Sequence, residues 1–264
     1  MTSPPPSPNV LSAFGVVGPA VPLPGGRGAS WRVGEVVLKP DVDAGFQQWL
    51  GTVVAGIDQQ GFRLPVVRRA DGGDWVVQGW GAQSMLPGAT VGEGPADWGA
   101  IITASRALHA ATADLSRPAF LDLRSDPWAA ADRAAWGETP RRVSPGVGDL
   151  VRRLDAVPAP PGPPQLVHGD LAGNVLVVPA GPPSVIDFSP YWRPSSYAEG
   201  IVLADALCWH GAPPEILHEL AVPIEAVARG LFFRLLTSSG VSPTHRGEVA
   251  ELARYQSVMR ALDL

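Results

Sequence analysis

The chain of 264 residues contains one cysteine, Cys208, and one lysine, Lys39. A single cysteine cannot close a disulfide within the chain, which excludes a disulfide-stapled scaffold. No apolar run approaches the ~20 residues that a membrane-spanning helix needs. The first residues carry neither the basic segment nor the apolar core of a signal peptide. From these absences we expect a cytoplasmic protein without a membrane partner.

Positive charge is also in short supply, with 20 basic residues against 25 acidic ones and a net charge of -5. This balance disfavours a nucleic-acid partner. A hydrophobic fraction of 45% with only 17% charged residues predicts a globular chain that buries a core. All basic residues except Lys39 are arginines. The exception is conspicuous, because lysine and arginine are not interchangeable in a binding site.

The chain changes character near residue 87. Residues 1–9 are rich in proline and serine and are expected to be a disordered tail. Residues 10–86 favour short strands around glycine turns, with one helix from 44 to 57. The expected strands cover 20–23, 30–33, 36–39, 63–68 and 75–80.

Residues 87–264 are mostly helical in period, with three short apolar strands that begin near residues 165, 175 and 185. The expected helices cover 96–115, 127–136, 148–154, 199–208, 214–238 and 245–262. The sequence therefore predicts an α+β fold with a small β-rich N-terminal lobe, residues 10–86, and a larger, mainly helical C-terminal lobe, residues 87–264.

The strongest local signal is the segment from Leu166 to Val177. His168 and Asp170 leave an apolar strand, and Asn174 follows on a glycine turn before the next strand. Thirteen residues later, Asp187 ends another short strand. Two carboxylates and an amide on adjacent loop tips can supply oxygen ligands for Mg²⁺ and place a base beside them.

These motifs resemble the kinase-like superfamily, in particular the aminoglycoside phosphotransferases and an uncharacterised actinobacterial group among their relatives. The resemblance implies a two-lobe protein-kinase-like fold that binds Mg²⁺ with ATP or GTP. It implies that Asp170 is the catalytic base, that His168 holds the same loop, and that Asn174 and Asp187 are magnesium ligands. Asp205 resembles the family's structural aspartate, which supports the catalytic loop.

The resemblance extends to the N-terminal lobe. Lys39, on a predicted strand, would pair with the nucleotide phosphates, and residues 80–87 would be the linker that hydrogen-bonds the adenine. The preceding turn would cover the phosphates with four residues: Gly25, Gly26, Gly28 and Ser30. Taken singly, each of these features is weak, since a glycine turn or a strand lysine is common. Their order along the chain is what favours the kinase-like interpretation.

Two features depart from the family pattern. Only three residues separate Asp170 from Asn174, where the usual loop has four. The helix that normally supplies a glutamate to the lysine offers Gln47 and Gln48 instead. A neutral amide can hydrogen-bond the ammonium of Lys39 but does not balance its charge.

Two functions therefore stay open. The first is a phosphotransferase that moves the γ-phosphoryl of ATP or GTP to a hydroxyl of an unidentified small molecule. The second, favoured by the two departures, is a catalytically degenerate kinase-like protein that binds nucleotide or regulates a partner. An α/β hydrolase is disfavoured, because no Gly-x-Ser-x-Gly motif is present. The arginine-rich stretch from 115 to 157 would suit an anionic acceptor or no acceptor at all.

Overall fold

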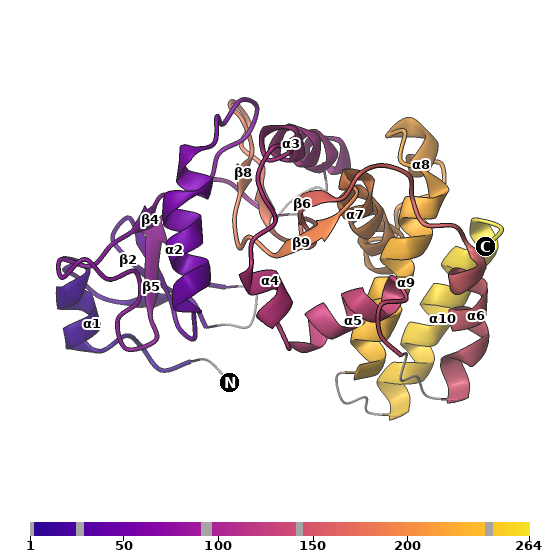
Figure 1. Ribbon diagram of the computed structural model, residues 1–264, viewed down its shortest axis with the longest axis horizontal. Helices are drawn as coiled ribbons and strands as arrows, with labels where there is room; N and C mark the ends of the chain where they lie inside the picture. Colours follow the sequence, from indigo (N-terminus) through magenta and orange to yellow (C-terminus); the bar gives the residue numbers. More distant parts are fainter. Residues whose placement is uncertain (1–2, 25–28, 91–96, 141–144, 241–244) are drawn as a thin grey trace.

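The computed structural model describes residues 3–24, 29–90, 97–140 and 145–240, and residues 245–264. Its N-terminal part is a five-stranded antiparallel sheet in the order β1-β2-β3-β5-β4, next to helix α2 (Figure 1). No described helix is long and apolar enough to cross a membrane. The strands are β1 (Val21–Pro22), β2 (Trp31–Val33), β3 (Val36–Lys39), β4 (Val67–Arg68) and β5 (Gly81–Ser84).

Strand β3 is the centre of this sheet. Its first three residues, Val36 to Leu38, are buried, and their apolar side chains favour a pleated strand between two neighbours. In the register, Val36 faces Val33 of β2, and Lys39 faces Gly81 of β5. Lys39 is therefore fixed at the end of the strand, beside the part of the chain that leads into the helical region.

Helix α1 (Pro8–Ala13) begins inside the stretch that we expected to be a disordered tail. Proline occupies the first turn, and the hydroxyl of Ser7 accepts a hydrogen bond from the N–H of Val10. Both are favourable helix starts, which the pattern of prolines concealed. Val10 and Phe14 pack under the sheet in a small apolar cluster of the N-terminal part.

The strand expected at residues 75–80 does not form. Gln78 and Gly79 both have positive φ angles, of 50° and 80°, so the chain turns back there and leaves only an isolated bridge between Val77 and Trp80. The fourth partner in the sheet is β5, which lies inside the range expected for the linker. Helix α2 (Ala44–Thr52) and a short 3₁₀ turn (Val54–Gly56) cover most of the predicted helix, and Asp43 caps its first turn.

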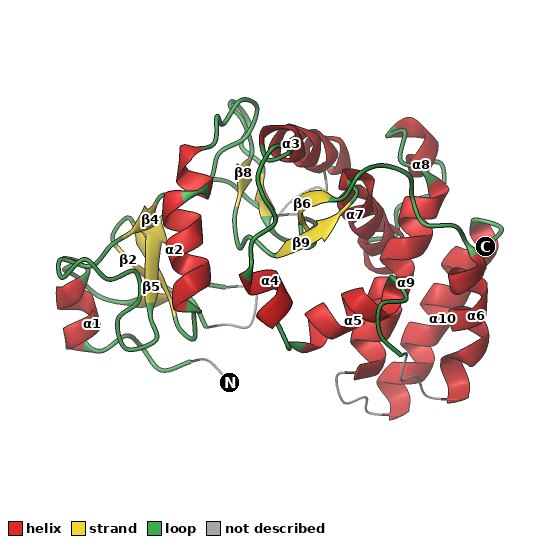
Figure 2. Ribbon diagram, viewed as in Figure 1, coloured by secondary structure: helices red, strands yellow, loops and turns green. Residues whose placement is uncertain are grey.

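The C-terminal part is mainly helical, with two small antiparallel sheets between its helices and α2 (Figure 2). In one sheet β6 (Gln165–His168) pairs with β9 (Pro190–Arg193), and in the other β7 (Val175–Leu176) pairs with β8 (Ser184–Val185). The described helices are α3 (Trp98–Ala111), α4 (Phe120–Leu123), α5 (Pro127–Ala135), α6 (Gly148–Ala156), α7 (Ser195–Trp209), α8 (Ile216–Glu219), α9 (Ile224–Gly240) and α10 (His245–Ala261).

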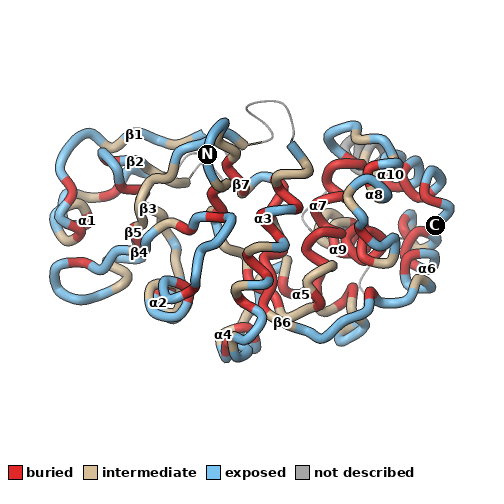
Figure 3. The backbone as a smooth tube through the Cα atoms, turned by 90° about the horizontal axis from the view of Figure 1, so that it is seen from above, coloured by how far each residue is buried: buried red, intermediate tan, exposed pale blue. Residues whose placement is uncertain are grey.

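Helices α7 and α9 form the middle of the core, and Figure 3 shows both as largely buried. They cross at two glycines. A Cβ on Gly200 would collide with the carbonyl of Ala226, and a Cβ on Gly230 would collide with the backbone of Gly200. This close crossing brings the following turns of the two helices together, where Asp205 and Arg234 meet.

Candidate active site

The loop after β6 carries the predicted catalytic residues. His168 ends the strand opposite Pro190 of β9, and Gly169 follows under the ring of Tyr191. A Cβ on Gly169 would lie 2.5 Å from two atoms of that ring, so only glycine fits there. The side chain of Asp170, which comes next, is 48% exposed and accessible to a substrate.

The buried ring of His168 ties this loop to the segment before Asp187. Its Nδ1 accepts the backbone N–H of Asp170 at 3.1 Å, which assigns the ring proton to Nε2. Nε2 then donates to the carbonyl of Ile186 at 3.0 Å. Burial lowers the pKa of His168, which keeps the ring neutral and in this tautomer.

A second buried histidine, His109 of α3, lies behind the first. Its Nε2 accepts the backbone N–H of His168 at 3.0 Å, and its Nδ1 donates to the hydroxyl of Ser105 at 3.2 Å. Burial, helped by the neighbouring His168, lowers the pKa of His109 to about 3. His109 was not among the residues predicted for the site. The spacing of Ser105 and His109, four residues apart on an apolar helix, was the available signal.

Asn174 folds back onto Asp170, the predicted catalytic base. Its Nδ2 donates to the carbonyl of Asp170 at 2.6 Å and to the Oδ2 of that residue at 3.0 Å. Its backbone carbonyl accepts the N–H of Ile186 at 2.9 Å, so Asn174 and Asp187 lie at the same end of the β7–β8 pair. The shortened loop thus still brings Asn174 to Asp170, and no described residue donates a hydrogen bond to the side-chain oxygen of Asn174.

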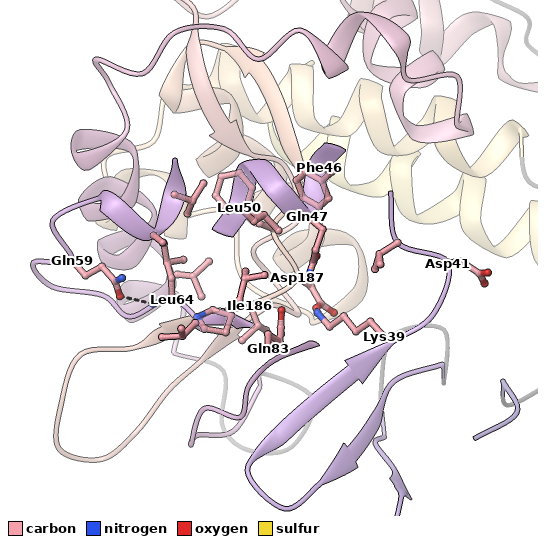
Figure 4. Close-up of a pocket in the computed structure, with 18 residues that line it drawn as sticks. Lys39, Asp41, Phe46, Gln47, Leu50, Gln59, Leu64, Gln83, Ile186 and Asp187 are labelled. Carbon is pink, nitrogen blue, oxygen red and sulfur yellow. Dashed lines mark hydrogen bonds and ion pairs between the residues drawn. The ribbon is translucent and has the colours of Figure 1, made fainter. Parts of the chain in front are cut away.

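Lys39 and Asp187 form an ion pair, and Figure 4 shows their side chains pointing toward each other. Asp187 has a φ of 50°, a left-handed conformation that aspartate tolerates better than most residues. Gln47 of α2 is buried beside Gly81 and points to the same place (Figure 4). Burial lowers the pKa of Lys39 to about 8. The counter-ion that the helix lacks is therefore supplied by the predicted magnesium ligand.

A cavity of about 600 Å³ lies against this pair. Its walls are mainly apolar side chains of α2 and of the segments near β4 and β8, and Gln83 of the predicted linker also lines it. Ser30, at the start of β2, is not among the lining residues; its carbonyl accepts the N–H of Leu23. The predicted phosphate turn with Gly25, Gly26 and Gly28 lies outside the described residues.

Asp205 reaches the catalytic loop through an arginine. Arg234 of α9 donates from Nε and Nη2 to the two oxygens of Asp205, at 2.7 and 2.6 Å, and from Nη2 to Oδ1 of Asp170 at 2.8 Å. Burial opposes the charge of Arg234, but the two carboxylates raise its pKa above the usual value. Burial raises the pKa of Asp205, and the Arg234 charge opposes that rise. The sequence signal for Arg234 was a charged residue between apolar neighbours, Phe232-Phe233 and Leu235-Leu236, which needs a partner when the helix is buried.

A family model described as the phosphotransferase enzyme family matches residues 53–191. The chain belongs to this family. The matched segment contains the loop with His168, Asp170 and Asn174, and also Asp187, while Lys39, Asp205 and Arg234 lie outside it. A search of curated proteins found no match.

Solved structures of other phosphotransferases and kinases match nearly the whole chain, which confirms the kinase-like fold predicted from the sequence. An aminoglycoside phosphotransferase, APH(4)-Ia, is 19% identical, covers 96% of this chain and 97% of its own, and has a TM-score of 0.63. A microcompartment-associated aminopropanol kinase is 16% identical, with 95% and 93% coverage and a TM-score of 0.62. A thermostable mutant of APH(4)-Ia in a ternary complex with ADP and hygromycin B is 17% identical, with 96% and 97% coverage and a TM-score of 0.62.

Proposed function

We propose that this family member is a phosphotransferase that moves the γ-phosphoryl of ATP or GTP to a hydroxyl of a small molecule. The observation that carries the proposal is the meeting of four groups: the Asp170–Asn174 pair at one end of β7–β8, with the Lys39–Asp187 pair next to it. Family membership and the ADP complex of APH(4)-Ia support the nucleotide.

The residues present fit a magnesium ion. Asp187 is 41% exposed, and the free amide oxygen of Asn174 lies at the same end of the β7–β8 pair, so both can offer the oxygen ligands that Mg²⁺ prefers. When bound, the metal would neutralise charge on the phosphates. Lys39 would exchange Asp187 for the phosphates, and a free lone pair of the Asp170 carboxylate would accept the proton of the attacking hydroxyl.

The acceptor is inferred to be small and not polycationic. A hollow of about 110 Å³ beside Asp170 is lined by Arg124, Trp128, Tyr191 and Arg234, among others, and a larger one of about 380 Å³ shares Arg124 and Tyr191 with it. The carboxylates that line both hollows are already paired with arginines: Asp170 with Arg234, Asp122 with Arg117, and Asp132 and Glu138 with Arg193. Arg133, in contrast, has no ion-pair partner among the described residues. A polyamine would find no unbalanced negative charge here, whereas an anionic hydroxyl compound would find arginine donors.

The first experiment measures thermal stability with Mg²⁺-ATP or Mg²⁺-GTP. Nucleotide turnover is then measured with hydroxy acids and sugar phosphates as anionic acceptors, and with hygromycin B as the amine-bearing comparison. Ligand at 100 times its dissociation constant should stabilise the fold by about 2.7 kcal/mol. Lys39→Ala and Asp187→Ala should lose this stabilisation. Asp170→Asn should keep it but lower turnover by roughly 10²- to 10⁴-fold. Asp114→Asn, an exposed aspartate away from the site, is the control.

A second candidate, a nucleotide-binding protein without catalysis, is favoured by one observation. Lys39 and Asp170, the two groups that must engage substrates, are both held in ion pairs within the chain. Mg²⁺-dependent stabilisation without turnover on any acceptor would support this candidate over the phosphotransferase. Unchanged turnover in Asp170→Asn would overturn the assigned base.

A further inference from the structure

We propose that Arg234 is a positioning residue: the buried Asp205 fixes its guanidinium, and the guanidinium in turn fixes the carboxylate of the catalytic Asp170. The inference rests on the proposed function. Asp205 is only 10% exposed and lies on the core helix α7, whereas the side chain of Asp170 is 48% exposed on a loop. Arg234 is the side chain that joins the two.

The geometry fixes both oxygens of the Asp170 carboxylate. Two parallel bonds to Asp205 set the plane of the guanidinium, and its Nη2 then donates to Oδ1 of Asp170 at 2.8 Å. Oδ2 of Asp170 receives Nδ2 of Asn174 at 3.0 Å. Rotation of the carboxylate would break both bonds, yet each oxygen keeps a lone pair that can accept a hydroxyl proton.

The position of Arg234 is itself fixed by the core. The residue stands one turn after Gly230, at the close crossing of α7 and α9, and its side chain is 16% exposed. Its Cζ lies 5.5 Å from the centre of the Phe233 ring, a cation–π distance. A lysine at this position would offer a point charge without the planar fork, so it would hold one carboxylate better than two.

The fold supplies a matched comparison. Arg106 of α3 donates from Nε and Nη2 to Glu199 of α7, an inter-helix arginine–carboxylate pair of the same type. It has no bond to the catalytic loop; its further partner is the carbonyl of Leu220. Removal of this pair tests what the loss of such a bridge costs the fold alone.

The test uses the double variant Arg234→Met with Asp205→Asn, which leaves no unbalanced buried charge and so is expected to fold. We expect its kcat to fall roughly 100-fold, because a small misplacement of a catalytic group has this effect. The KM for Mg²⁺-ATP should change by no more than about twofold, since ground-state binding is untouched. The single variant Arg234→Lys, with Asp205 intact, should have a kcat between that of the double variant and that of the wild type. The control double variant, Arg106→Met with Glu199→Gln, should keep the wild-type kcat.

Two results would overturn the proposal. One is a wild-type kcat in the Arg234→Met, Asp205→Asn variant; the other is an equal fall in the Arg106→Met, Glu199→Gln control. If the wild type binds Mg²⁺-ATP without turnover, the proposed phosphotransfer fails, and the role of Arg234 is then decided by crystal structures. A displaced Asp170 carboxylate in the double variant would support the positioning role, and an unmoved one would refute it.

Discussion

Among the described residues, the Asp170 carboxylate has two side-chain partners, Asn174 and Arg234, and the buried Asp205 in turn holds Arg234. The Lys39 ammonium has one ionic partner there, Asp187, which is also a predicted magnesium ligand. Three helices hold the loop with Asp170. His109 of α3 accepts the N–H of His168, and Asp205 of α7 holds Arg234 of α9, which donates to Asp170. The proposed nucleotide side of the site, around Lys39, is built from strand β3, the partly exposed carboxylate of Asp187 and Gln47 of α2.

This difference separates a part of the site that folding completes from a part that the ligand must complete. Buried, fully bonded polar groups are rigid, because each alternative arrangement leaves a donor or acceptor unpaired. An ion pair such as Lys39–Asp187, with one partner 41% exposed, is open to exchange with phosphate and metal. Perturbation of the first part should therefore cost stability, and perturbation of the second should change ligand affinity.

The largest effect is expected for Gly200→Ala. The added Cβ would collide with the backbone of Ala226 at the crossing of α7 and α9, and neither helix backbone can yield as a flexible side chain could. Overpacking of this kind destabilises by roughly 3 kcal/mol. Urea unfolding measures the loss, and turnover should fall with it, because Arg234 moves with α9.

The control is Gly56→Ala, a position where a Cβ meets no atom within 4 Å and φ is not positive. Its unfolding free energy should stay within ~0.5 kcal/mol of the wild type, as for most surface changes. Equal losses in the two variants would show that the crossing is not the stiff element that the comparison requires.

A smaller, pH-dependent loss should come from His109. Its folded pKa of about 3 lies below the unfolded value of 6.5, so the unfolded chain binds the proton first as the pH falls. The stability is fully present above about pH 6.5 and declines toward pH 3 by up to ~1.4 kcal/mol per pH unit, so the loss between pH 7 and pH 5 is about 2 kcal/mol. His109→Gln, which can still accept the N–H of His168, should show a flatter decline between pH 7 and pH 5 in thermal unfolding.

His168, which burial also keeps neutral, adds to this decline, so the variant should flatten the curve without abolishing it. His218→Gln, the same exchange at an exposed position of the described chain, is the control for the substitution itself. A pH dependence identical in His109→Gln and in the wild type would mean that His109 is not the buried neutral group described above.

The sequence was sufficient where the chemistry is local. The spacing of His168, Asp170 and Asn174 between two apolar strands predicted the loop, and Asp187 after the next strand completed the set. It was insufficient for contacts between distant parts of the chain. Arg234 donates to Asp170, 64 residues away, and His109 accepts the N–H of His168, 59 residues away. Such contacts depend on the close α7–α9 crossing and on how far α3 is buried against β6, and the periodicity of the sequence predicts neither.

The fold shows the same division. Strand β3 and the helix after Asp43 follow from local side chains and were predicted, whereas the position of β5, the last strand of this sheet along the chain, was not. The left-handed conformation of Gln78, an unusual one for glutamine, turns the chain before residue 80 and moves the strand to Gly81–Ser84. The resemblance predicted that Asp205 supports the loop with Asp170, but it did not predict Arg234, through which the bonds of Asp205 reach that loop.

The smallest effect is expected where the comparison is sharpest, at Gln47. Gln47→Glu would place a carboxylate on α2 beside the Lys39–Asp187 pair and release Asp187 for magnesium. The Lys39–Asp187 pair that this change releases has one partner 41% exposed, and such pairs contribute ~0.2–1 kcal/mol, so the dissociation constant of Mg²⁺-ATP should fall by about threefold. Calorimetric titration measures it, with Gln48→Glu, the exposed neighbour on the same helix, as the control. Weaker binding in Gln47→Glu would mean that Asp187 is a better partner for Lys39 than a carboxylate at position 47 of α2. The Lys39 part of the site would then be complete without the ligand.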